Sequence, residues 1–169
     1  TPIKSSAASD VYKRQRMELA PDGLIYVSSR GDYYGTGSDV FVVNPETQKV
    51  VGHLGVAASE MCMDSDYLYL ISVEWSYVSG KNEVRYTLYD TRKKEILPHS
   101  FITDGTEKEI KIPYGLGVNP ETKEIFVSDA TDYVTPGYLY CFSAEGRMQW
   151  KVRAGDIPAH FAFTSVDFY

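Results

Sequence analysis

The chain has 169 residues, of which 43% are hydrophobic and 24% are charged, and its formal net charge is −6. This amount of apolar material is enough for a packed core, so the composition excludes a disordered chain. The only basic runs are residues 12–16 and 92–94, and no apolar run approaches the ~20 residues of a membrane helix. We therefore expect no nucleic-acid partner and no transmembrane segment in this chain.

The first fifteen residues differ in character from the rest. Residues 1–15 have no apolar periodicity, and the hexamer "DVYKRQ" at 10–15 can be encoded by the end sequence of a transposon adapter used in DNA library preparation. We predict that residues 1–15 are a non-native, adapter-derived segment, and we leave them out of the fold prediction.

The remainder reads as short strands in a repeat. Tyr occurs 14 times, and Tyr, Val, Ile and Phe favour strands. The strands "IYVS" (25–28), "YLIS" (69–72) and "IFVS" (125–128) begin 44 and 56 residues apart, and turn residues separate each from its neighbours. A period of this length with several short strands per unit is typical of a β-propeller blade.

We predict four strands in each unit. The expected strands, in chain order, are "MELA", "LIYVSS", "DVFVVN" and "VVGHL", then "EMCM", "YLYLIS", "EVRYTLYD" and "EIL", then "YGLGV", "IFVSD", "GYLYCFS" and "MQWKV". The motif "NPET" occurs twice, at 44–47 and 119–122, and we interpret both copies as hairpin turns at non-equivalent places in the repeat. "AHFAF" at 159–163 predicts one more strand.

The predicted fold is all-β: a partial β-propeller of four-stranded antiparallel blades spanning 16–169. The predicted blades are 16–56, 57–105 and 110–153, followed by a terminal strand at 158–169. Propellers have four to eight blades, so three blades and a strand do not close a ring. We therefore expect the chain to be a fragment of a larger propeller.

The segment "YGLGVNPETKEIFVSDATDYVTPGYLYCFSAEGRMQWKVRAGDIPAHFAF" resembles the C-terminal end of YVTN-type (YncE-like) propellers, which occur as surface lipoproteins in Bacteroidetes. The resemblance covers about residues 16–163 and is strongest over 113–163. It implies a seven-bladed ring, a lipoprotein anchor and a location at the cell surface or in the periplasm. Some members of this group resemble proteins that capture cobalamin for an outer-membrane transporter. The N-terminal blades and the lipobox cysteine of the group have no counterpart here.

The loops between the second and third strands predict a ligand site at the propeller mouth. Five residues after the strand-end serines Ser28, Ser72 and Ser128, each loop carries a tyrosine. Tyr and Trp combine a large rigid face with a polar tip, which suits a flat or amphipathic ligand. Alternatively, the tyrosines pack between blades, as repeated residues often do. The candidate ligand-binding residues are Arg30, Asp32, Tyr33, Tyr34, Glu74, Trp75, Tyr77, Asp129, Asp132, Tyr133 and His160.

Signals for catalysis or metal binding are weak. The three histidines show no metal-ligand spacing, and no nucleophile elbow occurs. Asp129 and Asp132 lack the further oxygen ligands of a calcium site. Cys62 and Cys141 follow no zinc spacing and are expected to be free thiols in the core. We therefore predict no cofactor, no metal site and no catalytic residues.

Three functions stay open. The first is a non-enzymatic surface protein that captures a small ligand, with cobalamin suggested by the resemblance alone, and delivers it to an outer-membrane transporter. The second is an interaction scaffold that binds a protein or a glycan. The third is a propeller hydrolase or lyase, whose catalytic residues would lie outside this fragment. A fold alone does not decide among them.

Overall fold

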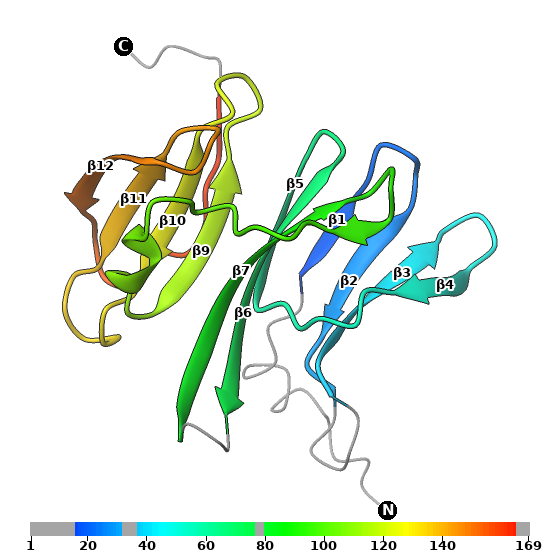
Figure 1. Cartoon of the computed structure of the whole chain (residues 1–169), viewed down its shortest axis with the longest axis horizontal. Coiled ribbons are helices and arrows are strands. Elements are labelled where there is room, and N and C mark those ends of the chain that lie inside the picture. Colours follow the sequence, from blue (N-terminus) through cyan, green and yellow to red (C-terminus); the bar gives the residue numbers. More distant parts are fainter. Residues whose placement is uncertain (1–15, 32–36, 77–79, 165–169) are drawn as a thin grey trace, which may run out of the picture.

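The computed structural model describes residues 16–31, 37–76 and 80–164, without the side chains at 75 and 76. The predicted adapter segment 1–15 lies outside the described residues. The described part is all-β, with twelve antiparallel strands in three four-stranded sheets (Figure 1). This agrees with the predicted strand content, pairing and number of sheets. Closure into a propeller ring stays a prediction.

Each sheet is a simple meander, in which consecutive strands are neighbours. Sheet A contains β1 (Met17–Leu19), β2 (Ile25–Ser29), β3 (Asp39–Asn44) and β4 (Lys49–His53). Sheet B contains β5 (Glu60–Asp64), β6 (Tyr67–Ser76), β7 (Lys81–Asp90) and β8 (Glu95–Ile96). Sheet C contains β9 (Pro113–Val118), β10 (Ile125–Asp129), β11 (Tyr138–Phe142) and β12 (Met148–Arg153).

The three sheets pack face to face in chain order, with their first strands side by side (Figure 1). One apolar cluster joins sheets A and B, where the rings of Tyr26 and Tyr89 meet edge to face at 5.9 Å. A second cluster joins sheets B and C, where Phe101 packs edge to face on Tyr69 and Tyr86. Alternate strand residues point to opposite faces, so both faces of sheet B are buried.

The two "NPET" motifs form the same local turn in different places. In each, the Asn side-chain Oδ1 accepts the N–H groups of the residues two and three positions later, at 2.9–3.3 Å (Asn44 and Asn119). The fifth residue, Gln48 or Lys123, has a positive φ of 56° or 63°. Asn44 ends β3, whereas Asn119 follows β9. The repeated motif is therefore a repeated turn, as predicted, and does not mark equivalent positions of the sheets.

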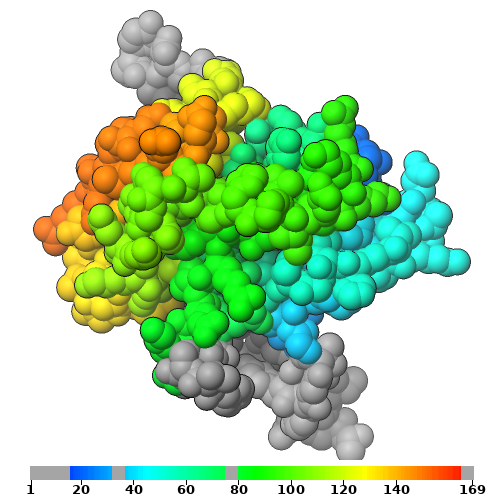
Figure 2. All heavy atoms as spheres, viewed as in Figure 1, coloured from blue at the N-terminus to red at the C-terminus, as the bar shows by residue number. Residues whose placement is uncertain are grey.

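The long connection from β8 to β9 passes in front of sheet B to the outer part of sheet C (Figures 1 and 2). Thr103 donates its N–H to the Gly146 carbonyl, and Asp104 accepts the Met148 N–H, so the connection is tied to the β11–β12 turn. It then forms the short 3₁₀ helix η3 (Thr106–Lys108) and returns to β9. The connection thereby covers the outer side of the junction between sheets B and C.

The predicted terminal strand is not a strand in residues 158–164, which the structure describes. This segment nevertheless lies along β9 on the face of sheet C that points away from sheet B. A Cβ atom at Gly117 would be 2.9 Å from the Cβ of Phe161, so only glycine leaves room for the Phe161 side chain. Phe161 and Phe163 pack on the Phe126 ring.

Candidate functional site

The ends of β2, β6 and β10 lie at one edge of the molecule together with the starts of β3, β7 and β11, and we call this edge the loop edge (Figure 1, bottom). The turns β1–β2, β5–β6 and β9–β10 lie at the opposite edge, which we call the turn edge. Strand alternation within each antiparallel meander sets this division. The strands that flank the predicted ligand loops therefore end at a common edge.

The three strand-end serines are buried, but they are not equivalent. Ser28 shares a face with Tyr26, which packs against sheet B, and Ser128 faces away from sheet B toward the segment 158–164. Ser72 shares a face with Leu70, and Leu70 packs against sheet A, which precedes sheet B in the chain. The repeat alignment is thus displaced by one residue in sheet B, and a one-residue displacement reverses the face of every side chain.

The β10–β11 connection presents an exposed tyrosine on a fixed backbone. Tyr133 is 50% exposed, and its ring meets the Tyr114 ring of β9 edge to face at 5.6 Å. Its φ is 64°, a conformation that residues with side chains seldom adopt, and its N–H donates to the Ala130 carbonyl. Val134 beside it is 80% exposed. The sequence analysis did not include Tyr114 among the candidate ligand-binding residues. The two glycines that follow it in the same strand, Gly115 and Gly117, could have drawn attention to it.

Asp132 fixes the same connection from the next position. Its Oδ1 accepts hydrogen bonds from the Val134 N–H at 2.9 Å, the Thr135 N–H at 2.7 Å and the Thr135 hydroxyl at 2.9 Å. These donors, the Thr135 N–H foremost, lower the pKa of the Asp132 carboxyl. The exposed carboxylate thus organises the turn through one of its oxygens.

Asp129 holds the backbone of two connections. It is 2% exposed, and its carboxylate accepts the N–H groups of Lys111 at 3.2 Å, Ile112 at 2.9 Å and Thr131 at 2.8 Å. Three backbone donors occupy both oxygens, which favours a structural role over ligand contact. Asp129 fixes the entry to β9 relative to the connection that carries Tyr133.

Three other predicted residues have described side chains, and they come from three different segments. Arg30 and Glu74 are exposed at the ends of strands in sheets A and B, and His160 is exposed in the segment beside β9. Asp32, Tyr33, Tyr34 and Tyr77 lie outside the described residues, as does the side chain of Trp75. Of the described members of the predicted set, Asp129, Asp132 and Tyr133 lie together at the β10–β11 connection.

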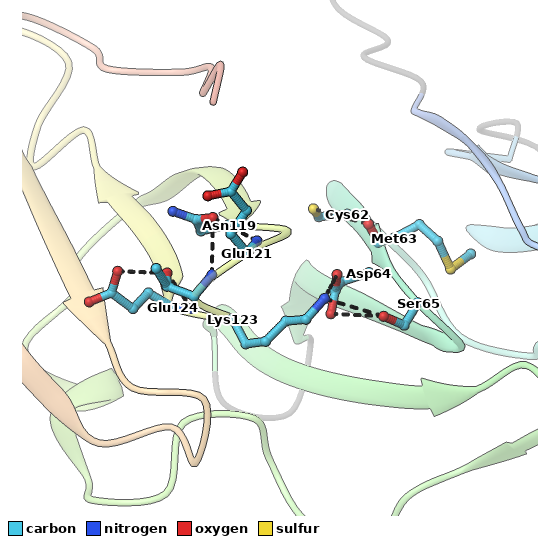
Figure 3. A network of polar contacts seen from close by, with 9 residues as sticks. Cys62, Met63, Asp64, Ser65, Asn119, Glu121, Lys123 and Glu124 are labelled. Atoms are coloured by element: carbon cyan, nitrogen blue, oxygen red, sulfur yellow. Dashed lines mark hydrogen bonds and ion pairs between the residues drawn. The ribbon is translucent and has the colours of Figure 1, made fainter. Parts of the chain in front are cut away.

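The turn edge carries a polar network that the sequence did not predict (Figure 3). The Lys123 Nζ donates to Asp64 Oδ1 at 2.7 Å and to Ser65 Oγ at 3.3 Å, which joins the β9–β10 turn to the β5–β6 turn. The Lys123 N–H donates to the Asn119 carbonyl, so the "NPET" turn aims the lysine at sheet B. This network connects sheets B and C.

We next searched the described residues for clusters of metal ligands and for helices that could span a membrane. Residues 16–31, 37–76 and 80–164 contain no group of three or more His, Cys, Asp or Glu side chains placed to hold a metal ion. Within the same ranges no helix has the length and apolar character needed to cross a membrane.

Cys62 and Cys141 are free thiols, as predicted. Cys141 is buried and Cys62 is half-buried. Comparison with known proteins finds no matching family model and no matching curated protein.

Proposed function

We propose that the three sheets are successive blades of a β-propeller that contains further blades. The meander order, the adjacent first strands and the burial of sheet B on both faces support this architecture. The segment 158–164 supports it as well. Its Phe161 packs on sheet C as the β5 residue Met61 packs on sheet A, which is the place of the first strand of a following blade.

We propose that the protein is a non-enzymatic binding protein and that its loop edge captures a small ligand. The observation that carries this proposal is the pair of Tyr133 and Tyr114. Tyr133 offers half of its surface to solvent, while the ring contact and the Asp132 turn hold it in place. A rigid aromatic face loses little conformational entropy when a flat ligand stacks on it.

The resemblance of the sequence to surface propellers supports a finer proposal. In it, the ligand is a large, flat and partly polar molecule such as cobalamin, the location is the cell surface or the periplasm, and an outer-membrane transporter receives the ligand.

Retention of a coloured ligand tests the proposal. The protein is mixed with cobalamin or, separately, with haem, then desalted, and the visible absorbance of the protein fraction is read. We expect cobalamin to be retained by the wild type and lost in Tyr133→Ala. The matched control is Tyr67→Ala, because Tyr67 is also exposed but begins β6 at the turn edge. Equal loss in both variants, or retention of neither ligand, would reject capture at the loop edge.

A second candidate is a scaffold that binds a protein or a glycan, and the β6–β7 ribbon favours it. Both strands have ten residues, and the ribbon extends beyond the neighbouring strands at the loop edge (Figure 1). Near its end Glu74 and Glu83 lie directly opposite each other, although like charges at such positions are unfavourable. Arg85 already lies 3.7 Å from Glu83, and a basic partner would add to this neutralisation, so Glu74→Gln would weaken partner binding.

A further inference from the structure

The described residues contain four buried side-chain oxygens without a hydrogen-bond partner. Unpaired buried polar atoms are rare in folded proteins because each loses its bond to solvent. The four atoms belong to residues on four different segments: β7, β11, the β10–β11 connection and η3. They are Tyr86 Oη, Tyr140 Oη, Thr131 Oγ1 and Glu107 Oε2.

Tyr86 and Tyr140 come from sheets B and C, which meet at a common junction. Tyr86 is 6% exposed on β7 and Tyr140 is 0% exposed on β11, and both belong to the same apolar cluster. Glu107 lies in η3, in the connection that covers the junction. Burial first, and then the charges of Asp129, Glu107 and Tyr140, raise the pKa of the Tyr86 phenol.

The chemistry of these atoms identifies what can satisfy them. Hydroxyls donate and accept, whereas a carboxylate only accepts, so the common partner must do both. A cation is disfavoured because the Lys151 ammonium already lies 4.4 and 4.6 Å from the ring centres of Tyr138 and Tyr140. Burial raises the pKa of the Tyr140 phenol and the Lys151 ammonium partly offsets this effect, although the Tyr140 hydroxyl makes no hydrogen bond of ordinary geometry.

We propose that Tyr86, Tyr140 and Glu107 hold an internal water molecule that links sheets B and C to the connection between them. A buried water makes about three hydrogen bonds to polar groups that otherwise lack partners, and these three residues supply that number. The water is then a structural component of the junction, and Glu107 is a positioning residue that ties η3 to both sheets through it.

Removal of the hydroxyls tests the proposal. If the Tyr86 hydroxyl binds the water, Tyr86→Phe raises the unfolding equilibrium constant about fivefold, as expected for one lost net hydrogen bond. If the hydroxyl has no partner, the same change leaves that constant unchanged or lowers it. The control is Tyr138→Phe, because Tyr138 is half-buried on the same strand as Tyr140.

A double-mutant cycle of Tyr86→Phe and Tyr140→Phe then reports whether the two phenols share one partner. We expect the double variant to lose less than the sum of the single variants, and additive effects would overturn a shared water. A crystal structure that resolves ordered solvent gives the direct readout. One solvent peak about 2.8 Å from both Tyr86 Oη and Glu107 Oε2 is expected. Direct hydrogen bonds among these side chains, with no solvent peak, would overturn the proposal.

Discussion

Arg16 holds Glu60 through a two-point contact, Nε to Oε2 at 2.7 Å and Nη2 to Oε1 at 2.9 Å. Arg16 precedes β1 and Glu60 begins β5, so the pair joins sheets A and B. The two side chains are only 22% and 7% exposed. The planar guanidinium matches the carboxylate at both oxygens, which makes such pairs stronger and more directional than single contacts.

Removing the arginine should therefore destabilise the junction of sheets A and B. Arg16→Met leaves the buried Glu60 carboxylate without its cation, and we expect the free energy of unfolding to fall by about 3 kcal/mol. Urea denaturation measures the change. Arg85→Met is the control, because Arg85 and Glu83 are exposed and 3.7 Å apart, and such pairs contribute about 0–1 kcal/mol. Equal effects of the two changes would contradict this prediction.

Asp129→Asn tests the structural role of the buried carboxylate. One oxygen still accepts, but the new amide group faces a backbone N–H, because donors occupy both oxygens of Asp129. We expect a loss of about 2 kcal/mol in the free energy of unfolding, as for hydrogen bonds to a charged group. Amide exchange should speed up at Lys111 and Ile112. Asp156→Asn, at an exposed position, should change neither quantity.

The strands could be predicted because turn residues separate them and apolar residues alternate within them. Sheet order followed, since short connections join neighbouring strands. The face of the sheet to which each side chain points could not be predicted from the equal spacing of the serines and tyrosines in the three repeats. Ser72 was aligned with Ser28 by counting residues along the chain. The pleat of β6 is shifted by one residue relative to that of β2, so Ser72 points toward sheet A. Spacing records distance along the chain, and the pleat decides the face.

The candidate site was harder to predict, because exposure and partners depend on tertiary packing. Asp129 and Asp132 look alike in the sequence, yet one is buried with three backbone donors and the other is exposed in a turn. Arg16 and Lys123 gave no signal, because their partners lie 44 and 59 residues away. Contacts over such separations leave no local pattern in a single sequence.

Gly117→Ala should loosen the segment 158–164 from sheet C. The added methyl group would lie 2.9 Å from Phe161, so the segment or the strand must move. We expect a loss of about 1–3 kcal/mol in the free energy of unfolding and faster amide exchange at Phe161. Gly52→Ala is the control, because a Cβ atom there meets nothing within 4 Å. A neutral Gly117→Ala would show that the segment does not pack on β9.

Both thiols should react slowly in the folded protein. Burial foremost raises the pKa of Cys62 to about 11 and that of Cys141 to about 11. At pH 8 only about one thiol in a thousand is then the reactive thiolate. An aromatic disulfide reagent should modify neither thiol until urea unfolds the protein, and the native rate should rise with pH up to about 11. Rapid reaction of either thiol at pH 8 would contradict the packing described for it.

The turn that presents Tyr133 should depend on the ionisation of Asp132. Its folded pKa lies below the ordinary value of 3.8, so the carboxylate stabilises the fold fully above that value and less as pH falls through the folded pKa. NMR titration of the Asp132 carboxyl should give a midpoint below 3.8, and the Tyr133 ring signals should follow the same midpoint.

Substitution of Thr135, whose hydroxyl donates to Asp132, tests whether this turn sets the pKa of Asp132 or whether acid acts on the whole protein. Thr135→Val removes one donor and should move the Asp132 midpoint upward, whereas Thr135→Ser should keep it low, because serine retains the hydroxyl. If the turn positions Tyr133 for a ligand, Thr135→Val should also weaken ligand retention more than Thr135→Ser does. An Asp132 midpoint at or above 3.8 in the wild type would show that the three hydrogen bonds do not hold the connection in solution.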